Sequence, residues 1–203
     1  MGNGNRGNTM IIKNGLVFTP EGKFEKKDLY VEGEYVAKET TDNKEVEAEG
    51  CYVIPGLVDI HFHGCVRHDM CDGTEESIQA LADYEAANGV LAICPATMTI
   101  PEEELFQAMK AAKEHKNGKG ADLVGINMEG PFINKEKKGA QKEEDIKLAD
   151  IELFHKLQEA AGGLIKLVDL APETEGAMDF IDQVKDEAVS YTHLRAHETL
   201  SDL

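Results

Sequence analysis

The stretch that decides the fold reads YVIPGLVDIHFHG at residues 52–64. It is an almost continuous apolar run that ends in two histidines and a glycine, which is typical of a buried strand that leads into a loop. Three similar apolar runs follow along the chain, and helical segments alternate with them. The strands are expected at residues 52–63, 90–97, 121–132 and 164–173, and the helices at residues 74–88, 99–116, 150–161 and 175–188.

Four alternations of strand and helix predict an α/β fold whose strands are parallel and buried on both faces. A doubly wound sheet and a partial (β/α)8 TIM barrel of about four β/α units both fit this pattern. A complete barrel takes about 250 residues, so a barrel would be half present here. Thr99 and Glu102 are spaced as a capping box, with Pro101 in the first turn, and predict the start of the second helix.

The first fifty residues have a different pattern and predict a small, mostly antiparallel β module at residues 10–51, part of a β-sandwich. Asn14-Gly15 and, more weakly, Glu32-Gly33 lie between apolar stretches and signal hairpin turns. Residues 1–9 are interpreted as a disordered polar extension. The barrel segment is expected at residues 52–189.

Composition excludes several classes of function. The chain has 203 residues, of which 39 are acidic and 21 basic, and its net charge of −18 argues against nonspecific binding of nucleic acid or of an anionic membrane. No apolar run is long enough to span a bilayer, and no signal peptide opens the sequence. The four cysteines form no C-x-x-C pair, which favours a reduced, cytoplasmic protein with free thiols.

His61 and His63 are the most informative pair of residues. Side chains two apart on a strand point to the same face, so both imidazoles are expected to project together and could share a divalent metal. Asp59 lies on the same face one pleat earlier, where its carboxylate could orient an imidazole without binding the metal itself. The alternative is a pair of histidines that hydrogen-bond to loops. His115 and His155, on expected helices, are predicted to face solvent.

Glu129 ends the third apolar run and is followed by Gly130-Pro131, which stops the strand. In a barrel the carboxyl ends of the parallel strands meet at one rim, so this carboxylate is expected near the two histidines as a third ligand. The alternative is a loop glutamate in a salt bridge.

Two segments resemble a known family. PGLVDIHFHG is similar to the first-strand signature of the amidohydrolase superfamily, and NMEGPFINKEKKGAQ resembles a segment of the N-acetylglucosamine-6-phosphate deacetylases. The resemblance implies a metal site of His61, His63 and Glu129 that holds one or two divalent ions, zinc or iron. It also implies that Ala140 and Gln141 contact the sugar. The activity implied is hydrolysis of the acetamide of a small amino-sugar phosphate, in a parent enzyme that is a homo-oligomer.

The resemblance runs from about residue 10 to about residue 188, and SYTHLRAHETLSDL at residues 190–203 is interpreted as foreign to the family. The family's catalytic aspartate comes from a later strand, so no catalytic residue is expected here and the chain as given is expected to be inactive. Its fourth strand would have an unpaired edge. Two alternatives stay open, namely an amidohydrolase for another amide or cyclic amide, and a non-catalytic fragment that binds a metal or a sugar phosphate.

Overall fold

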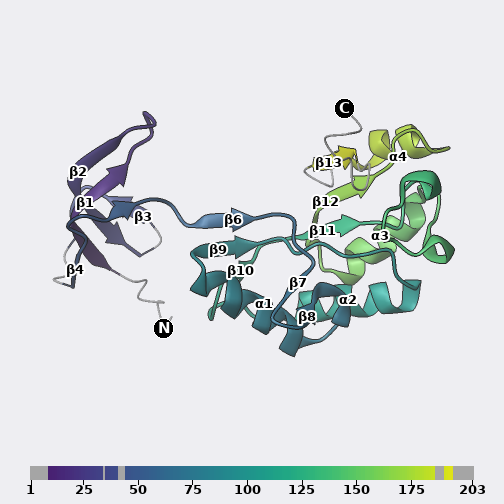
Figure 1. The fold of residues 1–203 in the computed structure, drawn as a ribbon, viewed down its shortest axis with the longest axis horizontal. Coiled ribbons are helices and arrows are strands. Elements are labelled where there is room, and N and C mark those ends of the chain that lie inside the picture. The colour runs from purple at the N-terminus through teal and green to yellow at the C-terminus, as the bar shows by residue number, and fades with distance from the viewer. Residues whose placement is uncertain (1–8, 34, 41–43, 186–189, 194–203) are drawn as a thin grey trace, which may run out of the picture. The chain divides into compact units, whose positions relative to one another are not determined.

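The computed structural model is a mixed α/β structure and describes residues 9–33, 35–40, 44–185 and 190–193. The chain forms two compact units, Met1–Pro55 and Gly56–Leu203 (Figure 1). The predicted disordered extension falls almost entirely on residues 1–8, outside the described residues, as does most of the tail at residues 190–203.

The first unit is a five-stranded sheet with the order β3-β2-β1-β4, in which β5 also pairs with β1. Its strands are β1 (Met10–Phe18), β2 (Phe24–Glu32), β3 (Tyr35–Ala37), β4 (Glu45–Glu47) and β5 (Tyr52–Val53). The pairs β1–β2 and β2–β3 are antiparallel, whereas β4 and β5 both run parallel to β1. The sheet is therefore more mixed than the sequence predicted.

The two turn signals in this unit have different outcomes. The hairpin at Glu32-Gly33 is confirmed, since β2 and β3 pair across it and Gly33 has φ +66°. The prediction of a hairpin at Asn14-Gly15 is wrong. Strand β1 continues through these residues, with a shift in its register against β2 between Ile12 and Gly15. Asn14 has φ 60° there, and its backbone N–H donates to the carboxylate of Asp28, so the left-handed residue forms a bulge instead of a turn.

The deciding stretch at residues 52–63 is two strands and not one. Its beginning is β5 in the first unit, and after Pro55-Gly56 the chain forms β6 (Leu57–Asp59) in the second unit. Proline lacks the N–H that a ladder needs, which explains why the apolar run is interrupted there.

The helices and the remaining strands of the second unit follow the expected alternation. The helices are α1 (Glu75–Ala87), α2 (Glu102–Glu114), α3 (Ile151–Ala160) and α4 (Ala177–Val184). The longer strands are β9 (Val90–Ile93), β11 (Ile126–Glu129), β12 (Ile165–Leu170) and β13 (Ser190–His193), with the short strands β7 (Gly64–Cys65), β8 (His68–Asp69) and β10 (Asp122–Leu123). The third expected strand is thus divided into β10 and β11.

Parallel pairing connects β6, β9 and β10 in one sheet and β11, β12 and β13 in another. A bridge between Ala96 and Asn127 links the two. The predicted unpaired edge of the fourth strand is wrong, because β13 pairs with β12 from Leu167 to Leu170. That strand lies in the segment interpreted as foreign to the family.

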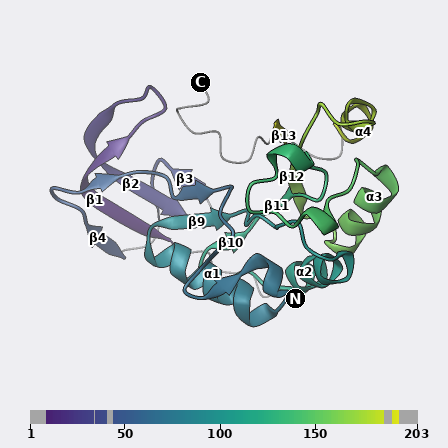
Figure 2. The same ribbon diagram turned by 45° about the vertical axis from the view of Figure 1, so that its right-hand side comes forward.

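Helices α1, α2 and α3 lie along one side of these strands, as the two views in Figures 1 and 2 show. The core between them includes Phe132, Phe154 and Leu157, all at most 1% exposed. The prediction that the strands are buried on both faces is wrong for β6 and β9, because Val58 and Leu91 are more than half exposed.

Two further predictions about these elements fail. The capping box at Thr99 is wrong, since α2 begins directly after Pro101 and has no side-chain cap. His115 is buried at the end of α2, with Nδ1 3.1 Å from a carboxylate oxygen of Glu75, whereas His155 is exposed as predicted. The four cysteines are free thiols, as expected. No helix in the described part of the chain is both long and apolar enough to span a membrane.

Candidate metal centre

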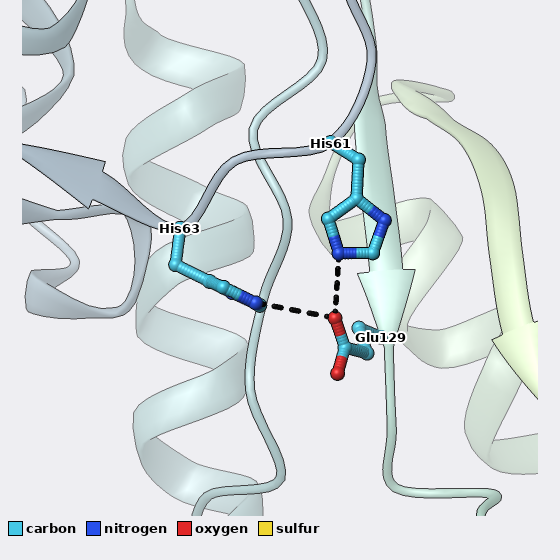
Figure 3. A group of neighbouring side chains, drawn as sticks. All are labelled: His61, His63 and Glu129. Atoms are coloured by element: carbon cyan, nitrogen blue, oxygen red, sulfur yellow. Dashed lines mark ion pairs between the residues drawn. The ribbon is translucent and has the colours of Figure 1, made fainter. Parts of the chain in front are cut away.

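The two histidines and Glu129 converge on one point, as Figure 3 shows. Strand β6 ends at Asp59, so His61 and His63 lie in the loop that follows it, and their predicted place on the strand is wrong. The loop still directs both rings to one side. His61 Nε2 is 2.9 Å and His63 Nε2 3.2 Å from the same oxygen, Glu129 Oε2.

Glu129 is the last residue of β11 and is only 6% exposed. Its other oxygen, Oε1, accepts a hydrogen bond of 2.7 Å from Gln141 Nε2, and the amide oxygen of Gln141 accepts one of 2.7 Å from the backbone N–H of Thr99. Gln141 therefore holds the carboxylate in place from the loop that follows β11. This role was not predicted, because nothing in the local pattern distinguishes a glutamine that contacts sugar from one that positions a ligand. Its neighbour Ala140 is exposed.

The Nδ1 atoms of the two rings have different surroundings. His63 Nδ1 is 3.3 Å from the backbone oxygen of Ala96. His61 Nδ1 is 3.4 Å from Oδ2 of Asp169, a carboxylate on β12 that is 1% exposed. Asp59, which was expected to orient an imidazole, uses Oδ1 to accept from the backbone N–H of His61 at 3.0 Å. Sequence reasoning missed Asp169, although it lies near the carboxyl end of an expected strand.

The contact between His63 and Glu129 favours the charged forms of these two residues. The hydrogen bond to Glu129 raises the pKa of His63 above its ordinary value, although burial opposes this. Burial by itself would raise the pKa of Glu129, but the hydrogen bond from His63, the two imidazoles and the Gln141 amide together hold that pKa below its usual range. The carboxylate is thus ionised at neutral pH in spite of its burial.

The geometry fits a divalent cation. One ligand atom from each of His61, His63 and Glu129 lies within 4.8 Å of the others, so the group could hold a metal ion. Zinc lies about 2.0–2.2 Å from nitrogen and oxygen ligands in a tetrahedral site, which separates neighbouring ligand atoms by about 3.3 Å. The two N···O separations of 2.9 and 3.2 Å are close to that value. Two imidazoles and one carboxylate are also the ligand set of several catalytic zinc sites.

Curated deacetylases of two amino-sugar phosphates match most of the chain. It is 35% identical over 185 residues to the N-acetylglucosamine-6-phosphate deacetylase of Bacillus subtilis (strain 168), a match that covers 88% of this chain and 45% of that protein. It is 28% identical over 184 residues to the N-acetylgalactosamine-6-phosphate deacetylase of Escherichia coli O157:H7, covering 89% and 49%. No family model matches the chain.

Solved structures agree on the fold. The N-acetylglucosamine-6-phosphate deacetylase of Pasteurella multocida superposes with a TM-score of 0.79 at 21% identity, covering 93% of this chain and 52% of that one. The enzyme of Thermotoga maritima gives a TM-score of 0.73 at 25% identity, covering 89% and 47%. The chain therefore spans about half the length of the relatives that it matches.

Proposed function

This chain is a homologue of the N-acetylglucosamine-6-phosphate deacetylases, which are hydrolases, and on that premise we propose that it contributes the metal site of such an enzyme. The whole protein would hydrolyse the acetamide of N-acetylglucosamine 6-phosphate to glucosamine 6-phosphate and acetate. The observation that carries this proposal is the convergence of His61 Nε2 and His63 Nε2 on Glu129 Oε2.

In this proposal His61, His63 and Glu129 hold one or two divalent ions, zinc or iron. When bound, such an ion supplies Lewis-acid chemistry, because it makes water a stronger nucleophile near neutral pH and polarises a carbonyl. Gln141 keeps the carboxylate of Glu129 directed at the two imidazoles. Ala140 is proposed to contact the sugar through its backbone, which its exposure permits.

We also propose that the second unit is part of a (β/α)8 barrel. Its support is the order of pairing, since β6, β9, β11, β12 and β13 follow one another in chain order with parallel neighbours or a parallel bridge. In such a barrel the carboxyl ends of the strands form the active-site rim. The site residues Asp59, Glu129 and Asp169 all lie at or near the ends of their strands.

Metal binding tests the site directly. The purified chain is expected to bind one or two equivalents of zinc, measured by competition with a chromophoric chelator and by elemental analysis. His63→Asn and Glu129→Gln should each weaken binding by at least about 100-fold, because each removes one of three ligands. His155→Asn is the matched control, since it removes an exposed histidine from α3. Wild-type affinity in His63→Asn would contradict the site.

The substrate is tested in the full-length protein. Acetate release is expected from N-acetylglucosamine 6-phosphate and not from hydantoin or dihydroorotate, which represent the cyclic amides. N-acetylgalactosamine 6-phosphate belongs in the same panel, because a relative is named for that activity. Turnover of a cyclic amide alone would replace the proposed substrate, and stoichiometric metal without any turnover would favour the non-catalytic alternative.

A further inference from the structure

The Nδ1 atom of His61 lies near one hydrogen-bond donor and one hydrogen-bond acceptor. Asn127 Nδ2 is 3.3 Å from this nitrogen, and Asp169 Oδ2 is 3.4 Å from it. The two residues come from the adjacent parallel strands β11 and β12. Asp169 is also the register partner of Glu129, so the two carboxylates approach the two nitrogens of the same ring.

The orientation of the Asn127 amide decides which of the two groups donates. Its Nδ2 also donates to the backbone oxygen of Ile60 at 3.1 Å. If the amide were turned over, its oxygen would face that carbonyl oxygen, which is repulsive. Asn127 therefore presents N–H to His61, and Asp169 is the group that can accept a hydrogen bond from Nδ1.

A neutral imidazole carries one N–H, and the nitrogen that binds a metal must be the other one. With Nε2 bound to a cation, the hydrogen is on Nδ1 and needs an acceptor. With Nε2–H directed at Glu129 instead, Nδ1 is bare and needs a donor. His63 has no such choice, because its Nδ1 faces the carbonyl oxygen of Ala96, which only accepts.

We propose that Asp169 is a positioning residue that keeps the hydrogen of His61 on Nδ1 and so leaves Nε2 available to the metal, while Asn127 stabilises the other tautomer. The hydrogen on Nδ1 of His63 is thus fixed by the carbonyl of Ala96, whereas His61 changes tautomer when the cation binds. This inference rests on the proposed metal site. It adds a carboxylate and an amide to the three ligands, each with its own measurable effect.

The test compares zinc binding of the wild type with that of Asp169→Asn and Asn127→Ala. Loss of the outer partner of a metal-binding histidine typically weakens affinity 10–100-fold. Asp169→Asn is expected to show about that loss. Asn127→Ala is expected to stay within about threefold of the wild type or to bind more tightly, because it removes the donor to the competing tautomer.

Nitrogen-15 NMR of the imidazoles gives a second readout, because it reports the tautomer of each ring directly. In the zinc form the Nδ1–H signal of His61 should also shift in Asp169→Asn, which changes its acceptor, whereas that of His63 should not. His61 should change from the Nε2–H to the Nδ1–H tautomer when zinc is added, whereas His63 should show Nδ1–H in the zinc form. The signals are assigned with His61→Asn. The zinc-dependent change needs no variant of Asp169, so it tests the predicted tautomer change even where Asp169→Asn does not fold.

The two proposals fail in different ways. If the wild type does not bind zinc, the metal site is wrong and this inference is lost with it. If the wild type binds zinc but Asp169→Asn binds it equally well, only the inference is overturned. A zinc form in which His61 carries its hydrogen on Nε2 overturns it as well.

Discussion

The two compact units differ in where their apolar side chains lie. In the first unit, the buried apolar residues among those described are Val17 and Ala48, whereas Tyr35 is 75% and Tyr52 68% exposed. In the second unit, the helices cover one side of the strands, and the core runs continuously from Met70 to Val184. The burial of apolar surface is the main source of folding free energy, and each Å² that is buried contributes about 25 cal/mol. The stability of the chain, and the rigidity of the metal site, therefore come from the second unit.

The largest expected difference between the units is in thiol reactivity. Cys71 lies in the second unit, and burial raises its pKa from 9.0 to about 12. Because only the thiolate reacts, alkylation at pH 8 should be roughly 1000-fold slower than for a thiol of ordinary pKa. Cys51, in the first unit, is exposed. Peptide mapping after iodoacetamide treatment should find Cys51 modified and Cys71 intact, with both modified in guanidinium chloride. Equal modification of the folded chain would show that the second unit opens readily around Cys71.

Core truncation should separate the units next. Phe154 is 0% exposed and packs edge-on against Phe180 at 5.6 Å, so Phe154→Ala should cost about 3–5 kcal/mol of unfolding free energy. Phe24 in the first unit is 46% exposed, and Phe24→Ala should cost less than about 1 kcal/mol. Urea unfolding followed by circular dichroism measures both. A loss of several kcal/mol in Phe24→Ala would mean that the exposed face of the first unit is covered in solution.

Two glycines with the same backbone angle give a smaller contrast. Gly130 and Gly22 both have φ +72°, in the left-handed region, where a side chain costs about 1–2 kcal/mol. At Gly22 a Cβ would meet nothing, so Gly22→Ala should cost only that amount. At Gly130 a Cβ would clash with the Thr99 side chain, and overpacking should bring the total to about 2–4 kcal/mol. Gly130→Ala should also weaken zinc binding, because it displaces the adjacent Glu129. Equal losses in the two variants would show that the loop after β11 yields easily.

Much of this arrangement could be predicted from sequence because it depends on local patterns. The four helices of the second unit follow from apolar spacing and glycine stops, and Glu129 follows from a strand that ends at Gly130-Pro131. The approach of Glu129 to the two histidines needed the rule that parallel strands end at one edge. That rule gives no information about which further side chains at the edge touch one another.

The misses have physical reasons of the same kind. Asn14-Gly15 is a hairpin signal, but pairing with β2 continues across it and turns the signal into a bulge. His115 looked solvent-facing, and its burial depends on α1 bringing Glu75 beside it. Gln141 contacts Glu129, which lies 12 residues away in sequence, and Asp169 contacts His61, which lies 108 residues away. Such pairings are set by tertiary packing, which no local period encodes.

The smallest expected effect is in the surface ion pairs, and there the units should be alike. Lys26–Glu49 in the first unit spans 2.7 Å with side chains 56% and 63% exposed, and Lys147–Glu102 in the second spans 2.8 Å at 42% and 45%. Exposed pairs of this kind contribute about 0.2–1 kcal/mol, since water and salt screen them. Double-mutant cycles to alanine should give a coupling below about 0.5 kcal/mol for either pair, falling toward zero in 1 M salt. A coupling above about 1.5 kcal/mol for Lys26–Glu49 alone would indicate that this face of the first unit is shielded from water. Couplings that are nearly equal and fall with added salt would instead show that the difference in stability between the units comes from apolar burial and not from surface charge.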